Sequence, residues 1–255
     1  HQAAAALSQN KNVLYITLEM AEERIAERID ANLLNISMED LAMLNRKLFN
    51  DKITNLQNKT TGTLIIKEYP TASAHTGHIR TLVNELALKR TFKPDIIFVD
   101  YINICASARF KPGSNVNSYT YVKAIAEEMR GLAVELDLPI VTATQTTRTG
   151  YVSTDIGLED TSESFGLPAT ADFMFALISS EELERAGQML VKQLKNRYND
   201  PTLNRKFIIG VDRARMKLFD VEQQAQNLIQ PEEEKYVEHN SKDKETEEKY
   251  KDFNF

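Results

Sequence analysis

Short, continuously apolar segments alternate with amphipathic helical segments along most of this chain, and this alternation limits the possible folds more than any other feature. Strands that are apolar on both faces must be covered on both faces, which is typical of parallel sheets. The helical segments between them show apolar residues at steps of three and four, most clearly Val122, Ile125, Met129, Leu132 and Leu136. We therefore predict an α/β fold, with a mostly parallel sheet and helices on both faces. The expected strands are Val13–Leu18, Thr63–Tyr69, 95–101, 139–145, 172–178, Met189–Lys195 and Phe207–Val211.

The charge of the chain divides unevenly between its body and its last 25 residues. The net charge is −6 for all 255 residues, and residues 231–255 contribute −4 of it, with nine acids and five lysines. We expect residues 1–230 to form one domain and residues 231–255 to be an acidic, disordered tail. The nearly neutral body has no general attraction for nucleic acid, so a DNA contact would need local basic loops or several subunits.

Two absences in the sequence exclude further classes of protein. The longest apolar run, Phe173–Ile178, is six residues long and is too short for a transmembrane helix. The only cysteine, Cys105, excludes an internal disulfide framework and a Cys-rich zinc site. We expect a reducing, cytoplasmic setting and no membrane partner.

Polar residues follow several of the apolar segments at the points where the expected strands end. Glu19, Asp100 and Gln145 each stand at or just after such an end. Ligands of open parallel sheets bind at the carboxyl ends of the strands. An apolar strand followed at once by Asp has the form of a Walker B site, in which the carboxylate holds the water shell of Mg²⁺ beside a nucleotide. Three such side chains together favour nucleotide chemistry.

Each of these residues also has a simpler explanation. Strands often end in Asp, Glu19 could favour a helix dipole, and Gln145 could bond to loop backbone. His75 and His78 have the i, i+3 spacing of two metal ligands, but surface histidines are more common and no third ligand is near. Lys195 and Arg197 are expected to project to the same side of a strand end, either as an edge pair or as cations that reach a phosphate.

The phosphate-binding loop of P-loop proteins is absent from these residues. The motif GxxxxGK[ST] needs two glycines five residues apart, and none of the nine glycines has such a partner.

Taken together, the motifs resemble the RecA-like motor domain of DnaB-type replicative helicases, and most closely those of T-even-type bacteriophages. The resemblance covers about residues 1–220 and implies a RecA-like P-loop NTPase core. The matching stretches are NVLYITLEMAEERIAERIDANLL, IIFVDYINICASAR, NSYTYVKAIAEEMRGLAVELDLPIVTATQ, ESFGLPATADFMFALI and VKQLKNRYND.

The resemblance implies an ATP-driven enzyme that uses Mg²⁺ and assigns a role to each matching residue. Glu19 matches the base that activates the attacking water, and Asp100 matches the Walker B ligand of Mg²⁺. Gln145 is similar to the sensor of the γ-phosphate. Lys195 and Arg197 resemble the cation pair that reaches the nucleotide of the neighbouring subunit.

The same resemblance implies single-stranded DNA as the track, a ring hexamer as the assembly, and a primase and a helicase loader as partners. Glu163, Ser164 and Gly166 match a DNA-facing loop, and Arg109 and Lys111 are plausible additional phosphate contacts. One departure is Ser162, because the family commonly has Arg at that position.

The missing P-loop is the larger departure, and it leaves more than one interpretation open. We expect a fragment of a 5′→3′ replicative DNA helicase that lacks its front end and has little or no ATPase activity alone. The alternatives are a RecA- or RadA-type recombinase, and a non-catalytic DNA-binding or assembly protein that has lost its P-loop.

Overall fold

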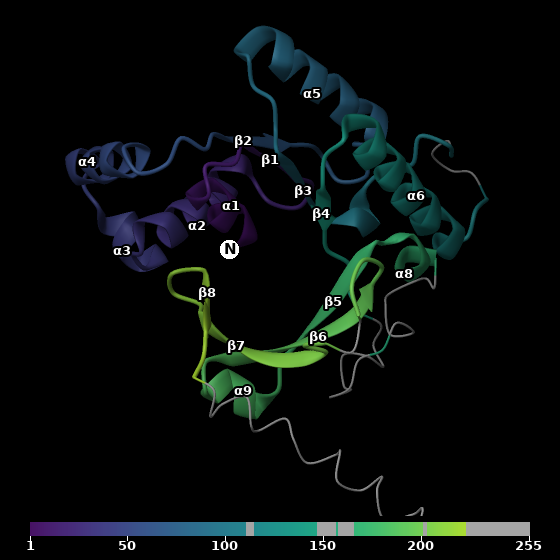
Figure 1. Ribbon diagram of the computed structural model, residues 1–255. Coiled ribbons are helices and arrows are strands. Elements are labelled where there is room, and N and C mark those ends of the chain that lie inside the picture. The colour runs from purple at the N-terminus through teal and green to yellow at the C-terminus, as the bar shows by residue number, and fades with distance from the viewer. Residues whose placement is uncertain (111–114, 147–156, 158–165, 201–202, 223–255) are drawn as a thin grey trace, which may run out of the picture.

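The chain contains a four-stranded parallel sheet and a second, antiparallel sheet (Figure 1). The computed structural model describes residues 1–110, 115–146, 157, 166–200 and 203–222. The strand order of the first sheet is β2-β1-β3-β4, with every pair parallel. Its strands are β1 (Val13–Thr17), β2 (Leu64–Glu68), β3 (Ile96–Asp100) and β4 (Ile140–Thr142).

Helices cover both faces of this sheet because its strands are apolar on both sides. Leu14 and Ile16 point to the face that packs against α5 (Thr76–Arg90) and α6 (Ser118–Leu136). Alternate residues, such as Val13, point to the face covered by α1 (Gln2–Ser8) and α2 (Glu22–Leu34). Leu14, Ile16 and Val13 are all 0% exposed, and burying each such side chain contributes about 1.5–3 kcal/mol. The prediction of a covered parallel sheet is confirmed.

The helix before β4 shows how local sequence sets the ends of an element. The Asn117 side chain accepts a hydrogen bond from Thr120 N and begins α6, and Asp137 ends it in the left-handed conformation with φ 51°. Between these ends, the stripe of apolar residues predicted from the sequence is buried. Two shorter helices, α3 (Met38–Met43) and α4 (Arg46–Gln57), bury no residue fully and lie to the side of the sheets (Figure 1).

The second sheet differs from the expected single, mostly parallel sheet, because its four strands are antiparallel. Its connections, residues 179–187, 197–205 and 213–216, are shorter than the dozen or so residues that a parallel crossover needs. Three short elements around this sheet were not predicted: α8 (Gly166–Thr170), α9 (Glu181–Arg185) and β8 (Lys217–Asp220). The order is α8 (Gly166–Thr170), β5 (Phe173–Ile178), α9 (Glu181–Arg185), β6 (Gln188–Asn196), β7 (Lys206–Asp212) and β8 (Lys217–Asp220).

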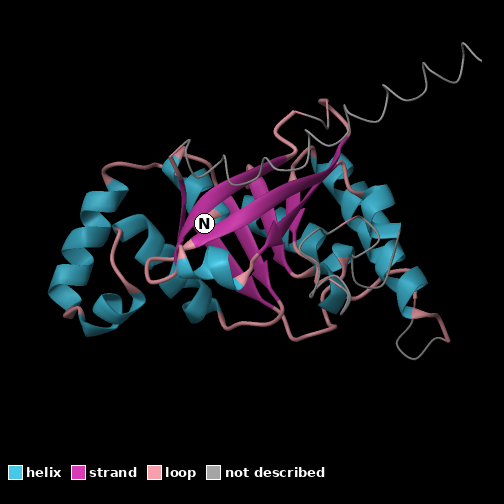
Figure 2. Ribbon diagram, turned by 90° about the horizontal axis from the view of Figure 1, so that it is seen from below, coloured by secondary structure: helices cyan, strands magenta, loops and turns pink. Residues whose placement is uncertain are grey.

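The two sheets are tied together at both ends of the second sheet. At one end, Asn32 Nδ2 of α2 donates to Met216 O at 2.5 Å, and Met38 N donates to Ala214 O at 2.9 Å. At the other end, α8 packs against α6, and Arg130 pairs with Asp172. Seen from below, the long strands of the second sheet cross in front of the first (Figure 2).

The predicted strand positions are confirmed to within a few residues. The largest difference is β4, which covers three residues of the expected 139–145. The backbone after Thr142 leaves the sheet, because Ala143 O accepts from Ile102 N at 3.2 Å in the short 3-10 helix Ile102–Ile104. None of the helices in the described parts of the chain is long and apolar enough to cross a membrane. The tail expected at 231–255 lies outside the described residues.

Candidate active site

Two predicted catalytic residues, Glu19 and Gln145, and the predicted Mg²⁺ ligand Asp100 lie at or just after the ends of β1, β4 and β3, at one edge of the parallel sheet. Strands β1 and β3 are direct neighbours, and Thr17 is in register with Asp100. The backbone continues this pairing for one more step, because Leu18 N donates to Asp100 O at 3.0 Å. Glu19 is the next residue and is exposed. The structure therefore brings the segment that carries Glu19 beside Asp100.

A turn after β1 directs Glu19 away from the core. Thr17, which is 0% exposed, donates from its hydroxyl to Met20 O at 2.8 Å and accepts from Met20 N at 3.1 Å. These two bonds bend the backbone around the residues between them. A buried threonine thus holds an exposed carboxylate at the end of the strand.

The carboxylate of Asp100 has one oxygen engaged and one available. Its Oδ2 accepts from the Tyr15 hydroxyl at 3.0 Å, and the Tyr15 ring stacks on Phe98 at 6.0 Å between centroids. Burial raises the pKa of the Tyr15 phenol, and the charge of Asp100 and this hydrogen bond raise it further. Tyr15 therefore stays a donor. Within the described residues, no donor reaches Oδ1 of Asp100.

The donors at this edge fit Mg²⁺ bound chiefly through water and phosphate. Mg²⁺ usually takes one or two protein carboxylates and completes its shell with waters and substrate phosphates. The described residues contain no group of three or more His, Cys, Asp or Glu side chains that could hold a metal on their own. The oxygen Oδ1 of Asp100, which no donor of the described residues reaches, would supply the single carboxylate ligand of such a site.

Gln145 lies beside the end of β3. Its Nε2 donates to the Tyr101 hydroxyl at 3.2 Å, and the preceding Thr144 donates from Oγ1 to Asn103 Oδ1 at 2.8 Å. Gln145 is therefore connected to the residue that directly follows Asp100. The structure places these residues at one edge, and their chemical roles stay predictions.

The predicted cation pair at the end of β6 projects to one side, as expected. Lys195 Nζ donates to the carbonyls of Pro168 and Ala169 at 2.6 and 3.0 Å. Arg197 donates from NH2 to Ala169 O at 2.8 Å and from NH1 to Asp172 Oδ1 at 3.1 Å. Burial lowers the pKa of the Lys195 ammonium, and the neighbouring Arg197 charge lowers it further. A contact of this pair with a second subunit stays a prediction.

Only two of the five predicted DNA-contacting residues lie in the described part of the chain. Lys111, Glu163 and Ser164 lie outside it. Arg109 follows the end of β3 and pairs through NH1 with Glu127 Oε2 at 2.5 Å. Gly166 is buried, and a Cβ there would lie 2.7 Å from Lys123 Cγ, so close packing of α8 on α6 explains this glycine. A DNA contact at either residue stays a prediction.

Glu128 is a site residue that the sequence interpretation missed. Its side chain is only 7% exposed, and its carboxylate accepts from Ser107 Oγ at 2.6 Å and from Ala108 N at 2.8 Å. It therefore fixes the segment that leads from β3 to Arg109. The available signal was an acidic residue on the apolar stripe of α6, three residues after Ile125 and four before Leu132.

The histidine pair and the cysteine have structural explanations. His75 Nδ1 accepts from Gly77 N at 3.0 Å and caps α5, while the His78 ring lies beside the His75 ring, tilted by 38°, with 3.9 Å between the ring centroids. Burial lowers the pKa of His75, and the neighbouring His78 lowers it further. Burial raises the pKa of the Cys105 thiol to about 12. These residues support the start of a helix and the core.

Replicative helicases are among the known proteins that this chain is similar to. The phage T4 protein described as a DnaB-like replicative helicase is 47% identical over 224 residues, which are 87% of this chain and 47% of that protein. A probable plasmid replicative DNA helicase of Chlamydia muridarum is 29% identical over 144 residues, 56% of this chain and 30% of that protein. The chain thus spans about half the length of the T4 protein.

Solved structures show the same fold at low sequence identity. A solved ATPase domain matches with a TM-score of 0.71 at 17% identity, covering 87% of this chain and 78% of that one. A DnaB-like replicative helicase, described with its interactions with primase, matches with a TM-score of 0.70 at 17% identity, covering 87% of this chain and 53% of that one. The family model for the DnaB-like helicase C terminal domain matches residues 1–245. Sequence and fold agree: this chain belongs to the DnaB-like helicase C-terminal domain family.

Proposed function

We propose that this chain is the ATP-hydrolysing motor part of a replicative DNA helicase that moves 5′→3′ along single-stranded DNA. The observation that carries the proposal is that Glu19, Asp100 and Gln145 lie at the same edge of the parallel sheet. This edge is where open α/β sheets bind ligands. The three side chains are a carboxylate open to solvent, a carboxylate with one oxygen that no donor of the described residues reaches, and an amide bonded to Tyr101, which directly follows β3.

Each side chain would do one part of the reaction. Asp100 would hold Mg²⁺ through its free Oδ1 while Tyr15 fixes its orientation. Bound Mg²⁺ neutralises charge that develops on the phosphates. Glu19 would accept a proton from the water that attacks the γ-phosphate. Gln145, connected through Tyr101 to the end of β3, would link the γ-phosphate to the segment that carries Arg109.

The assembly and the partners are part of the same proposal. Copies of the chain would form a ring hexamer, in which Lys195 and Arg197 reach the nucleotide of the adjacent copy. The DNA would follow Arg109, Lys111, Glu163, Ser164 and Gly166. A primase partner is supported by the DnaB-like helicase solved for its interactions with primase. A helicase loader as a further partner and the cytoplasm of a bacterial host as the location belong to the same proposal, and the similarity to a phage replicative helicase supports the bacterial host.

The cradle for the triphosphate would come from residues beyond these 255, because they contain no GxxxxGK[ST]. Without the backbone amides and lysine of such a loop, the chain alone would bind nucleotide weakly and hydrolyse little ATP. Robust DNA-stimulated turnover by the 255-residue chain would contradict this part of the proposal.

The test measures ATP hydrolysis and strand displacement by the full-length gene product that contains these residues. Glu19→Gln removes the base and keeps the shape, so we expect kcat to fall by about 10²–10⁴ while nucleotide binding is kept. Glu23→Gln is the matched control, because Glu23 is an exposed acid in the first turn of α2. It should leave kcat unchanged.

Two results would replace the proposal with an alternative. No ATP hydrolysis by the full-length protein would leave the non-catalytic interpretation, whereas full activity of Glu19→Gln would refute only the role of Glu19 as the base. Strand exchange without strand displacement would indicate a recombinase.

A further inference from the structure

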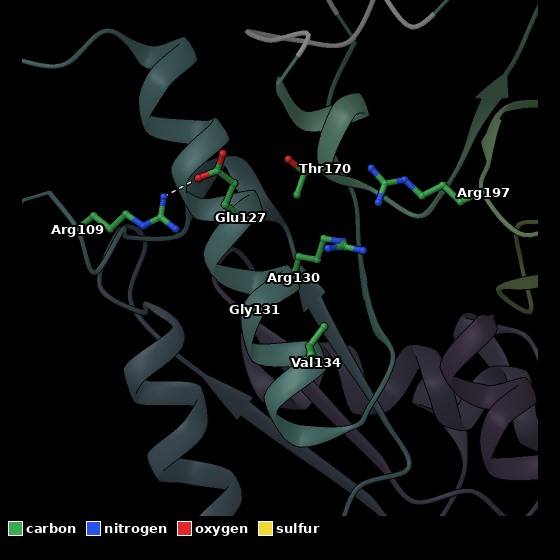
Figure 3. Close-up of a pocket in the computed structure, with 7 residues that line it drawn as sticks. All are labelled: Arg109, Glu127, Arg130, Gly131, Val134, Thr170 and Arg197. Atoms are coloured by element: carbon green, nitrogen blue, oxygen red, sulfur yellow. Dashed lines mark hydrogen bonds and ion pairs between the residues drawn. The ribbon is translucent and has the colours of Figure 1, made fainter.

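A pocket with three arginines lies between α6, α8 and the end of β6. Its volume is about 500 Å³, and its lining includes Arg109, Arg130 and Arg197 together with Glu127 and Thr170. Figure 3 shows Arg130 and Arg197 pointing toward one another from opposite sides of this space. Arg130 has no part in the function proposed above.

One carboxylate holds two of these arginines. Arg130 donates to Asp172 Oδ1 from Nε at 3.3 Å and from NH2 at 3.0 Å, and Arg197 NH1 donates to the same oxygen at 3.1 Å. Arg109 is held separately by Glu127 (Figure 3). Two guanidinium groups on a single oxygen leave several of their N–H donors for another acceptor.

The pocket carries an excess of positive charge. Three guanidinium groups face the carboxylates of Glu127, Glu128 and the shared Asp172, and the nearby Lys195 adds a fourth cation. The pKa of Lys195 is lowered chiefly by burial, with further contributions from Arg197 and Arg130, which is the effect of cations gathered at one place. An anion placed among these groups would relieve their mutual repulsion.

The pocket also has free space on the α6 side. A Cβ built on Gly131 would meet no atom within 4 Å, so the helix surface beside Arg130 is open. A volume of about 500 Å³ is in the usual range for small-molecule sites. Arginine forks bind phosphate oxygens in pairs, which lysine cannot do.

We propose that this pocket binds the polyphosphate of a nucleotide through Arg130 and Arg197, and that Asp172 is the positioning residue for both arginines. The nucleotide would be the one held by an adjacent copy of the chain, so this identification rests on the proposed function. Arg130 would then be a third cation beside Lys195 and Arg197. In the absence of a ligand, Asp172 pairs with Arg130 and Arg197, and Glu127 pairs with Arg109. Bound phosphates would take over the pairing with these arginines.

The first test titrates the 255-residue chain with inorganic tripolyphosphate at low salt by isothermal titration calorimetry. Arg130→Gln and Arg197→Gln should each weaken binding about tenfold, because each removes a charge-assisted contact. Arg130→Lys keeps the charge and loses the fork, so it should fall between the wild type and Arg130→Gln. Arg185→Gln is the matched control, since Arg185 pairs with Glu181 on the surface of α9. Equal binding by the wild type and Arg130→Gln would overturn the proposal, as would an equal loss in Arg185→Gln.

The second test separates positioning by Asp172 from its charge. Asp172→Asn and Asp172→Ala remove the same charge, but only Asn keeps an oxygen that can hold the arginines. Tripolyphosphate should bind the Asn variant more tightly than both the wild type and the Ala variant. Equal binding by the Asn and Ala variants would refute the positioning role. Circular dichroism melts would confirm that each variant is folded.

Two further measurements show whether the phosphate comes from a nucleotide or from DNA, and whether a failure concerns this pocket or the proposed function. If the chain binds oligothymidylate, this binding depends on Arg130, and tripolyphosphate does not displace the oligonucleotide, then the ligand of the pocket is DNA and the proposal is overturned. In the full-length protein, Arg130→Gln should lower kcat for ATP. A full-length protein without ATPase activity would refute the proposed function but leave the tripolyphosphate result standing. Normal hydrolysis and normal tripolyphosphate binding by Arg130→Gln would refute the proposed role of the pocket and leave the proposed function standing.

Discussion

Glu128 offers a direct test of how the segment after β3 is held in place. Its nearly buried carboxylate accepts two short hydrogen bonds, from Ser107 Oγ at 2.6 Å and Ala108 N at 2.8 Å. Hydrogen bonds to a charged group contribute about 1.5–3 kcal/mol each. Glu128→Ala loses both bonds, so we expect the free energy of unfolding to fall by at least about 3 kcal/mol. Glu128→Gln keeps one acceptor oxygen and should lose about half as much.

The assay is urea unfolding at pH 7, followed by amide hydrogen exchange of Ala108. Exchange at Ala108 N should become faster in both Glu128 variants because its acceptor is lost or weakened. Glu127→Ala is the matched control on the same helix, since Glu127 is 38% exposed and makes a surface ion pair with Arg109. It should cost no more than about 1 kcal/mol. The reasoning is wrong if both Glu128 variants are as stable as Glu127→Ala and Ala108 remains equally protected.

Two other predictions follow from shifted pKa values. Burial, and then the charge of Glu27, raises the pKa of Asp30 from 3.8 to about 6. The folded protein therefore holds this proton more tightly than the unfolded chain, and the free energy of unfolding contributed by Asp30 falls as the pH rises from about 4 to 6. Asp30→Asn should remove this fall and be more stable than the wild type at pH 7. Urea unfolding of both proteins at about pH 4, 6 and 7 measures the difference. If the free energy of unfolding changes with pH equally in both proteins, the assignment to Asp30 is wrong. Burial raises the pKa of Cys105 to about 12, so its thiol should react with iodoacetamide at pH 8 far more slowly in the folded protein than in urea, as followed by mass spectrometry. Equal rates in the two conditions would show that Cys105 is not buried.

Much of the first half of the fold could be predicted because its signals are local. The parallel strands are buried on both faces, so they are recognisable as apolar runs such as Val13–Thr17 and Ile96–Asp100. The stripe on α6 follows from the period of a helix. Glu19, Asp100 and Gln145 could be grouped in advance because the carboxyl ends of parallel strands share one edge.

The second half was predicted less well. The strands of the second sheet were found, but their antiparallel pairing and the short strand Lys217–Asp220 were not. A hydrophobic pattern reports which face of a strand is buried, and it does not report which neighbour the strand pairs with. Connection lengths carry that information, and they become useful only when the ends of each element are known.

By itself, the sequence determined the class of fold, the edge of the sheet where the predicted site residues lie, and the family, because periodicity and contiguous motifs are properties of neighbouring residues. Only the tertiary structure decided how the charged groups are paired. Asp172 holds Arg130 and Arg197, which lie 42 and 25 residues away along the chain. Such contacts depend on how α6, α8 and β6 pack in three dimensions, and a long-range ion pair leaves no periodic signal in the sequence. For the same reason, the pocket lined by Arg109, Arg130 and Arg197 became visible only once the chain was folded.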